Sequence, residues 1–208
     1  MTEVWPSHPV NIVFIMADNT WWKYFENTKD HPPRTLLVEA VKCVKHTDEA
    51  LDLGAGAFND IRYLLSLGFH HITAVDKEPL AEKIVHNFPS DRVFYVISTF
   101  EDFIFPENMY DLVNAQYSLP FIAPVNFIKV LNSINSSLKK EGIFTGQLFG
   151  VHDEWNTENG IMTFHTHKEV EKLLSDYEII DFKEEERDKN TAAGILKHWH
   201  VFHFIVKK

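Results

Sequence analysis

Glu49-Ala-Leu-Asp52-Leu-Gly54-Ala55-Gly56-Ala57-Phe58-Asn59-Asp60 is the stretch that decides the fold. Its apolar run up to Leu53 predicts a buried strand, and the glycines that follow allow the backbone to turn sharply and to approach a ligand closely. Ile61, Leu64 and Leu65 then have the spacing of a helix with one buried face. The first amide groups of that helix are free to bind a ligand. The stretch therefore predicts strand, glycine turn and helix, with a binding site at the turn.

A second predicted strand, His71 to Asp76, ends in a carboxylate 22 positions after Gly54. A carboxylate at this place can accept hydrogen bonds from both hydroxyl groups of a ribose. A dinucleotide-binding turn usually has a third glycine, whereas this chain has Asn59 at that position. Asp60, in the first helical turn, would repel a pyrophosphate but would suit a ligand with a cationic group. The pattern predicts a nucleoside cofactor and favours S-adenosylmethionine over NAD.

The rest of the chain alternates strands with helices as far as residue 174. The further strands are expected at 92–97, 111–115 and 143–149, and the helices at 35–45, 61–67, 80–88, 125–140 and 166–174. Gly142 is expected to end the fourth of these helices, and Thr166 with Glu169 forms a capping box for the last. Two strand candidates, 177–187 and 198–206, then follow with only a polar loop between them, so we expect an antiparallel pair.

Alternating strands and helices require a parallel sheet, because parallel neighbours need crossover connections. The fold class is therefore α/β: a Rossmann-like, doubly wound, mostly parallel seven-stranded sheet with a C-terminal antiparallel hairpin. We expect residues 35–208 to form a single domain and residues 1–34 to form an N-terminal arm or lid. Met16 is a candidate initiator, which would make residues 1–15 an extension.

Composition excludes some classes of function. The 208 residues include 30 acidic and 20 basic side chains, a net charge of −10, which disfavours a protein that binds nucleic acid by its phosphates. No run approaches the ~20 apolar residues of a membrane-spanning helix. With Cys43 alone, an intramolecular disulfide cannot form, so the sequence predicts a cytoplasmic protein without a membrane or nucleic-acid partner. The oligomeric state stays open.

From about Leu36 to its end, the chain resembles the class I S-adenosylmethionine-dependent methyltransferases. The resemblance rests on Leu-Asp-Leu-Gly-Ala-Gly at 51–56, Ala-Val-Asp-Lys at 74–77 and Tyr-Asp-Leu-Val at 110–113. Pro-Pro-Arg-Thr-Leu-Leu at 32–37 and Lys-His-Trp-His-Val-Phe-His at 197–203 make it most similar to small bacterial tellurite-resistance-type methyltransferases. The resemblance implies methyl transfer to a small-molecule acceptor: a thiol, an amine, a hydroxyl group or a metalloid oxyanion.

The resemblance also implies which residues contact the cofactor. The methionine portion would be held by Asp52, Gly54, Ala55, Gly56 and Gln116, the ribose by Asp76, and the adenine by Lys77, Thr99 and Phe100. Many members of the family have an acidic residue at the position of Thr99, so the backbone amide of Phe100 and the side chain of Asp102 are the alternative contacts for adenine. S-adenosylhomocysteine would be the product.

Methyl transfer is an in-line displacement that needs alignment of the reactants and exclusion of water more than a dedicated acid or base. Trp22 and Tyr24 lie in an aromatic cluster that could cover the sulfonium by cation–π attraction, with ordinary packing as the alternative. Arg34 could pair with the methionine carboxylate or lie on the surface. Tyr117 follows the strand 111–115, where open parallel sheets bind their ligands. Tyr24, Tyr117 and His200 are the candidate catalytic residues, and a structural sheet histidine is the alternative for His200.

The chain has 12 histidines, but the sequence predicts no metal site. On one strand, His198 and His200 point to one face and His203 to the other, so the three cannot form a single tripod without a bulge. Two other functions stay open: an NAD-binding oxidoreductase, and a nucleoside-cofactor-binding protein without catalysis. DNA bases are disfavoured as acceptors, because the segment Asn114-Ala-Gln-Tyr117 lacks the Pro-Pro motif of amino-directed DNA enzymes.

Overall fold

The structure is a computed structural model that describes residues 20–157, 160–192 and 194–208. The expected extension, residues 1–15, and the candidate initiator Met16 lie outside the described residues. None of the helices in the described ranges is both long and apolar enough to cross a membrane.

Helices and strands alternate along most of the chain. The helices are α1 (Thr20–Thr28), α2 (Thr35–Ala40), α3 (Asn59–Ser66), α4 (Glu82–Val85), α5 (Pro124–Ser137) and α6 (His167–Leu173), with 3-10 turns η2 (Val41–Cys43), η3 (Pro79–Ala81) and η4 (Leu119–Phe121). The strands are β1 (Glu49–Leu53), β2 (His71–Asp76), β3 (Val93–Ile97), β4 (Tyr110–Ala115), β5 (Leu138–Gly150), β6 (Phe164–His165), β7 (Glu178–Asn190) and β8 (Leu196–Lys207).

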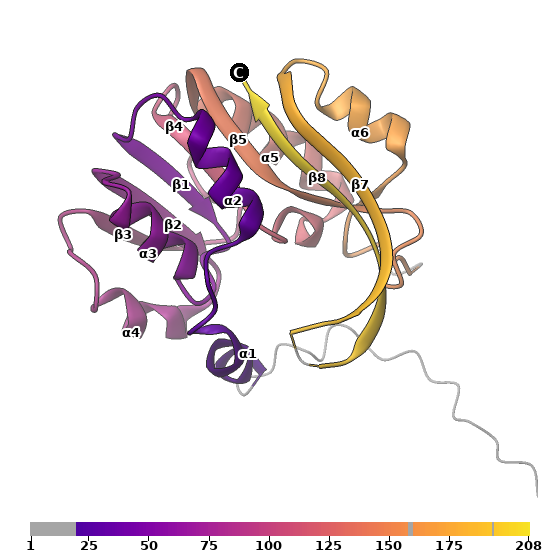
Figure 1. Ribbon diagram of the computed structural model, residues 1–208, viewed down its shortest axis with the longest axis horizontal. Coiled ribbons are helices and arrows are strands. Elements are labelled where there is room, and N and C mark those ends of the chain that lie inside the picture. The colour runs from indigo at the N-terminus through magenta and orange to yellow at the C-terminus, as the bar shows by residue number, and fades with distance from the viewer. Residues whose placement is uncertain (1–19, 158–159, 193) are drawn as a thin grey trace, which may run out of the picture.

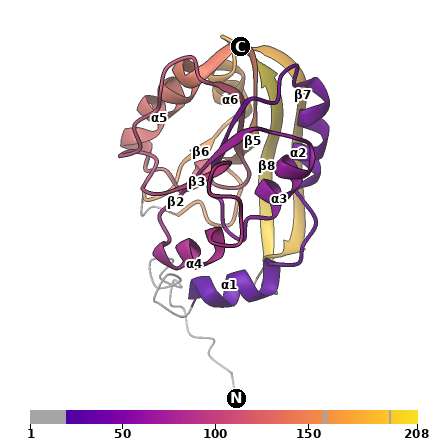
Figure 2. The same cartoon turned by 90° about the vertical axis from the view of Figure 1, so that its left-hand side faces the viewer.

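One sheet organises the molecule. Its strand order is β3-β2-β1-β4-β5-β8-β7, with the short β6 pairing with β5. The strands from β3 to β5 pair in parallel, whereas β8 is antiparallel to β5 and to β7. Figures 1 and 2 show α2 and α3 on one face of the sheet and α5 and α6 on the other. The strand order turns back between β1 and β4, and ligands of open α/β sheets bind at such a reversal.

The expected fold class is confirmed, including the antiparallel pair at the C-terminus. The capping box of Thr166 and Glu169 is also present, at the start of α6. The two-residue strand β6 was not expected from the sequence, because it is too short to show a period.

The expected helix 125–140 is too long at its end. Helix α5 stops at Ser137, and Leu138 already has an extended backbone and pairs with Tyr110. Leu138 is fully buried, so its apolar side chain fits the helical pattern although it belongs to the strand. Gly142 therefore lies within β5 rather than at a helix end. The expected helices 35–45 and 80–88 likewise shorten to α2 and α4, each next to a 3-10 turn.

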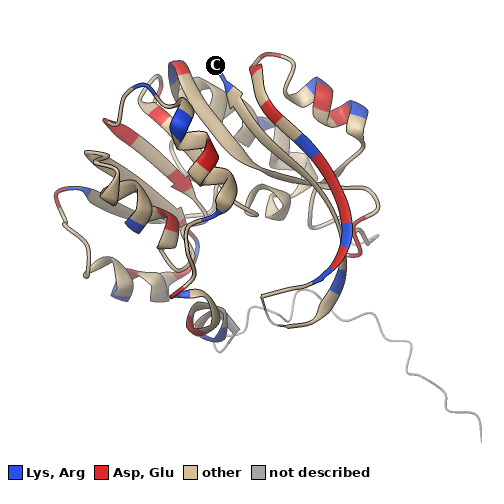
Figure 3. Cartoon of the chain, in the orientation of Figure 1, with Lys and Arg blue, Asp and Glu red and all other residues tan. Residues whose placement is uncertain are grey.

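The strands β7 and β8 form a long ribbon that curves back toward α1 (Figure 1). Near its tip, the side chain of Asn27 on α1 donates a hydrogen bond to the carbonyl oxygen of Ala192 at 3.5 Å. Figure 3 shows that β7, the edge strand, contains acidic and basic residues along its length. Charges on an edge strand oppose pairing with another chain.

Candidate cofactor site

The glycine turn after β1 is held in a backbone shape that needs glycine. Gly54 has a φ of +88°, and a Cβ atom on it would lie 2.6 Å from the Cβ of Ser118. The hydroxyl of Ser118 in turn donates to the carbonyl oxygen of Leu53 at 2.6 Å. The loop after β4 is thus packed directly against the turn. Position 54 therefore requires glycine for two reasons: its φ is positive, and Ser118 leaves no space for a side chain.

Gly56 contacts two residues outside the glycine turn, Tyr24 and Asp76. Its φ is +49°, and a Cβ atom there would lie 3.6 Å from both Cε1 and the hydroxyl oxygen of Tyr24. Its backbone N–H donates to Oδ2 of Asp76 at 3.0 Å. Tyr24 comes from α1, so the N-terminal helix packs against the turn.

A cavity of about 230 Å³ opens at this turn. Its walls come from the turn, the start of α3, the segment 24–35 and the end of β4. The lining residues are Tyr24, Thr28, His31, Pro32, Pro33, Arg34, Thr35, Asp52, Gly54, Ala55, Gly56, Ala57, Asn59, Asp60 and Gln116. The structure therefore brings together Tyr24, Arg34, Asp52, Gly54, Ala55, Gly56 and Gln116, which the sequence assigned to the site.

Two carboxylates, on Asp52 and Asp60, give the cavity its electrostatic character. The amide of Asn114 donates to Oδ1 of Asp52 at 2.7 Å and to Oδ2 of Asp60 at 3.2 Å. Burial, followed by the nearby charge of Asp60, raises the pKa of Asp52 to about 8. Burial also raises the pKa of Asp60. The backbone N–H of Arg34, which donates to Asp60 at 2.8 Å, opposes this rise but does not cancel it. Such a pair disfavours an anionic ligand and suits a cationic one.

Asn114 was not among the expected site residues, although the sequence held a signal for it. It is the polar residue near the end of a strand in which every position is buried. A buried amide must find hydrogen-bond partners. Here the partners are Asp52, Asp60 and Gln116, whose Nε2 donates to Oδ1 of Asn114 at 2.8 Å.

Asp76 lies at the end of β2 beside the turn, as expected. Its Oδ2 accepts from the N–H of Gly56, and its Oδ1 accepts from the N–H of Glu78 at 3.2 Å. Burial raises its pKa. The Asp76 carboxylate thus stabilises the backbone of the glycine turn without any ligand. Each oxygen can accept a further hydrogen bond, so contact with a ribose stays a prediction.

Asn59, which replaces the third glycine of a dinucleotide turn, ties the N-terminal segment down. Its Nδ2 donates to the carbonyl oxygen of Thr28, the last residue of α1, at 2.7 Å. Trp22, on the same helix, is 43% exposed and packs on Phe25 with ring centroids 5.1 Å apart. Trp22 does not line the cavity, whereas Tyr24 does.

The residues expected at the adenine end follow β2 and β3. The hydroxyl of Thr99 donates to Oδ2 of Asp102 at 2.9 Å, which closes a local turn. The ring of Phe100 reaches under the glycine turn, with its Cζ 3.8 Å from the position of a Cβ on Gly54. Lys77 directly follows the end of β2. None of these three residues lines the cavity, and their contact with adenine stays a prediction.

Tyr117 connects the cavity to an aromatic cluster. Its φ is +56°, unusual for a residue other than glycine, and its ring lies 6.0 Å from Trp199 and 6.4 Å from Phe149 between centroids. The guanidinium carbon of Arg34, which lines the cavity, stands 5.3 Å from the centroid of the Tyr117 ring. Tyr117 thus contacts a residue that lines the cavity but does not line the cavity itself.

His200 is separate from the cavity. It is 2% exposed, and its ring nitrogens contact Oε1 of Glu184 at 2.8 Å and the backbone N–H of His152 at 3.1 Å. It is not one of the lining residues. Its assignment as a catalytic residue therefore gains no support from the cavity.

Comparison with known proteins adds the family. Residues 51–145 match a family model described as "Methyltransferase domain". These residues therefore resemble a methyltransferase domain. This match covers β1 from Leu51 on, the glycine turn, Asp76 and Gln116, but not Tyr24, Arg34 or His200. A search of curated proteins found no match.

Solved structures show how widely the fold is shared. The protein is similar to 1,6-didemethyltoxoflavin-N1-methyltransferase from Burkholderia thailandensis, determined with 1,6-didemethyltoxoflavin and S-adenosylhomocysteine, with a TM-score of 0.67 and 18% identity over 100% of this chain and 93% of that chain. It is similar to TehB from Haemophilus influenzae, with a TM-score of 0.72 and 14% identity over 89% of this chain and 65% of that chain. The cyclase SpnF also matches, with a TM-score of 0.60 and 14% identity over 83% of each chain.

The domain match confirms the expectation of a methyltransferase, and S-adenosylmethionine is the methyl donor that goes with this domain. At these identities the neighbours show the fold alone. Because a cyclase shares that fold, the acceptor has to be argued from this chain's own residues.

Proposed function

We propose that the methyltransferase domain transfers a methyl group from S-adenosylmethionine to a small-molecule acceptor. The observation that carries the proposal is the cavity at the glycine turn, where Asp52 and Asp60 face a space covered by Tyr24. A dinucleotide would bring a pyrophosphate to this place, beside two carboxylates, which disfavours an NAD-linked oxidoreductase.

The residues of this chain fit such a cofactor in three ways. Asp52 and Asp60 would hold its cationic methionine end, and Arg34, which lines the same cavity, would pair with its carboxylate. Gly56 lines the cavity and has no side chain, so a ligand there can approach its backbone closely. Asp76 would accept hydrogen bonds from the ribose, and Lys77, Thr99 and Phe100 would surround the adenine.

Bound S-adenosylmethionine supplies an electrophilic methyl group. The chain has to align the acceptor with that group and exclude water. Tyr24 covers the cavity from one side. Its helix, α1, is held in place by the hydrogen bond from Asn59 to Thr28 at the end of that helix. Tyr117 and the nearby Trp199 form an aromatic surface along which an acceptor could bind. The acceptor class, which includes thiols, amines, hydroxyl groups and metalloid oxyanions, rests on the resemblance described above.

Calorimetric titration with S-adenosylmethionine, S-adenosylhomocysteine and NADH tests the cofactor. We expect one equivalent of the first two to bind and no binding of NADH. Release of S-adenosylhomocysteine is then measured with a thiol, an amine, a phenol and tellurite as acceptors. Binding of NADH alone would overturn the proposal. Binding of S-adenosylmethionine without turnover of any acceptor would instead favour a binding protein without catalysis.

A further inference from the structure

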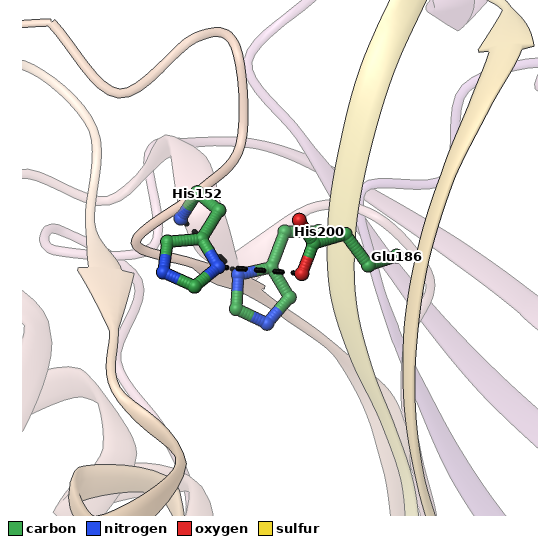
Figure 4. Close-up of side chains that lie close together, drawn as sticks. All are labelled: His152, Glu186 and His200. Carbon is green, nitrogen blue, oxygen red and sulfur yellow. Dashed lines mark hydrogen bonds and ion pairs between the residues drawn. The ribbon is translucent and has the colours of Figure 1, made fainter.

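A cluster of potential metal ligands lies outside the cofactor cavity. It joins His152, in the turn after β5, with Glu186 on β7 and His200 on β8. One ligand atom of each lies within 4.8 Å of the other two. Figure 4 shows the two imidazole rings and the carboxylate directed toward one another. None of the three lines the cofactor cavity.

Tertiary packing brings these residues together. Glu186 and His200 are cross-strand partners in the β7–β8 ribbon. Gly150, at the end of β5, makes room for the His200 ring, because a Cβ atom at that position would overlap its Nδ1. His152 follows two residues later, and its ring stacks on that of His200 with centroids 4.9 Å apart.

The tautomer of His200 suits metal binding. Its Nδ1 accepts the backbone N–H of His152 at 3.1 Å, so this nitrogen carries a lone pair rather than a proton. Its Nε2 donates to Oε1 of Glu184 at 2.8 Å. A carboxylate on the far nitrogen orients a ligating imidazole and increases its basicity. Glu184 is itself bound by His167 at 2.7 Å, which fixes its position.

The carboxylate of Glu186 is similarly placed. Its Oε2 lies 3.3 Å from Nδ1 of His152, and its Oε1 lies 3.1 Å from Nε2 of His198. His198 is anchored in turn by Asp188 at 2.7 Å. One oxygen is thus held by an outer partner while the other faces the two imidazoles.

Two imidazole nitrogens and one carboxylate oxygen form a ligand set that suits Zn²⁺, with a fourth position left for water. Ligand atoms around a tetrahedral Zn²⁺ ion with bonds of about 2.0 Å stand roughly 3.3 Å apart, so this cluster has to contract. The side chains of His152 and Glu186 are 64% and 46% exposed and can move, whereas buried His200 supplies the fixed ligand. Binding would replace the hydrogen bond from the His152 N–H to His200.

We propose that His152, Glu186 and His200 bind one divalent transition-metal ion of the Zn²⁺ class. The ion would join the β7–β8 ribbon to the segment after β5. This proposal does not depend on methyl transfer.

The test uses tag-free full-length protein treated with chelator and then dialysed. Zn²⁺ binding is measured by calorimetry, and Co²⁺ binding by its visible spectrum, in the wild type and in His152→Ala and Glu186→Gln. Both substitutions are at exposed side chains, and thermal unfolding without metal checks that each variant folds. His71→Ala is the matched control, because His71 forms a similar contact with Glu49 at 2.9 Å elsewhere on the sheet.

We expect one ion per chain and a 10- to 100-fold loss of affinity, on the order typical for altered metal sites, in each cluster variant but not in His71→Ala. Zn²⁺ should also raise the melting temperature of the wild type and not that of Glu186→Gln. Failure of the wild type to bind, or equal binding by wild type and both cluster variants, would overturn the proposal. Adventitious binding would appear as an equal loss in all three variants and would also overturn it.

Discussion

Gln147 holds Gln116 through a side-chain hydrogen bond of 2.8 Å, donated by Nε2 of Gln147 to Oε1 of Gln116. Oε1 of Gln147 in turn accepts the backbone N–H of Tyr117 at 2.8 Å. With Asn114, these amides form a chain from Asp52 to the loop after β4. The direction of every amide is set from the Tyr117 end, because a backbone N–H only donates and each amide oxygen only accepts. The chain links the cofactor cavity to Tyr117.

Gln147→Leu should remove two hydrogen bonds of this chain and leave the Tyr117 N–H and Gln116 Oε1 unpaired. Gln147 is 2% exposed, so we expect the free energy of unfolding to fall by about 2–4 kcal/mol. Thr145→Val is the control, since the Thr145 hydroxyl makes a single buried hydrogen bond to the carbonyl oxygen of Phe204. Urea denaturation measures both variants. An equal cost for the two would show that the amides do not act as a connected chain.

Asp52→Asn should change stability in a way that depends on pH. The pKa of Asp52 is about 8 in the folded protein, above its ordinary value of 3.8, so the folded state binds a proton more tightly than the unfolded state does. The stabilisation is therefore complete below about pH 4 and is lost as pH rises toward 8. We expect the free energy of unfolding of the wild type to fall across this window more steeply than that of Asp52→Asn. Urea titrations at pH 5 and pH 8 compare the slopes.

Cofactor binding should release protons near neutral pH. A cationic ligand favours ionised Asp52, so its arrival lowers the pKa and expels a proton from the fraction of molecules that carry one. Calorimetry at pH 7 in buffers of different ionisation enthalpy measures this release for S-adenosylmethionine. The release should disappear in Asp52→Asn. If wild type and variant show the same buffer dependence, Asp52 does not face the cationic end of the ligand.

Gly56→Val and Asp76→Ala should each weaken cofactor binding. Valine at position 56 would force a β-branched side chain into a positive φ and against Tyr24. Asp76→Ala would leave the Gly56 N–H without its partner and remove the expected ribose contact, a loss of about 1–3 kcal/mol in binding free energy. Asp181→Ala, at an exposed position on β7, serves as the control. Unchanged binding of S-adenosylhomocysteine by both site variants would mean that the site is misplaced.

Asp153→Asn and Lys197→Met should each destabilise the protein, and the double variant should cost less than the two single costs added together. Lys197 and Asp153 form a buried ion pair, with Lys197 at 2% and Asp153 at 3% relative exposure. The Lys197 ammonium also stands 3.8 Å from the centroid of the Trp199 ring. Either single substitution leaves a buried charge uncompensated, which costs about 3–5 kcal/mol, whereas the double variant leaves no buried charge and its methionine keeps the apolar stem of Lys197. Chemical denaturation of both variants and of the double variant checks the difference. A cost below 1 kcal/mol for Asp153→Asn would contradict it.

Much of the fold could be predicted from local sequence patterns. Apolar strands, glycine punctuation and helical periodicity identified β1, β2 and the C-terminal pair, because period and turn chemistry depend on neighbouring residues alone. The same locality placed Asp52, Gly54, Gly56 and Asp76 at the ends of adjacent parallel strands. Leu138 was assigned to a helix because a buried apolar residue fits a helix and a strand equally well.

The sequence by itself determined the class of fold, the glycine turn, the carboxylate at the end of β2 and the preference for a cationic nucleoside over a dinucleotide. Tertiary structure alone decided that Tyr24 covers Gly56, that Gln147 connects Gln116 to Tyr117, and that His152 meets Glu186 and His200. Strand order and cross-strand register create these contacts between residues far apart in the chain, and no local period in the sequence encodes which distant side chains will face one another.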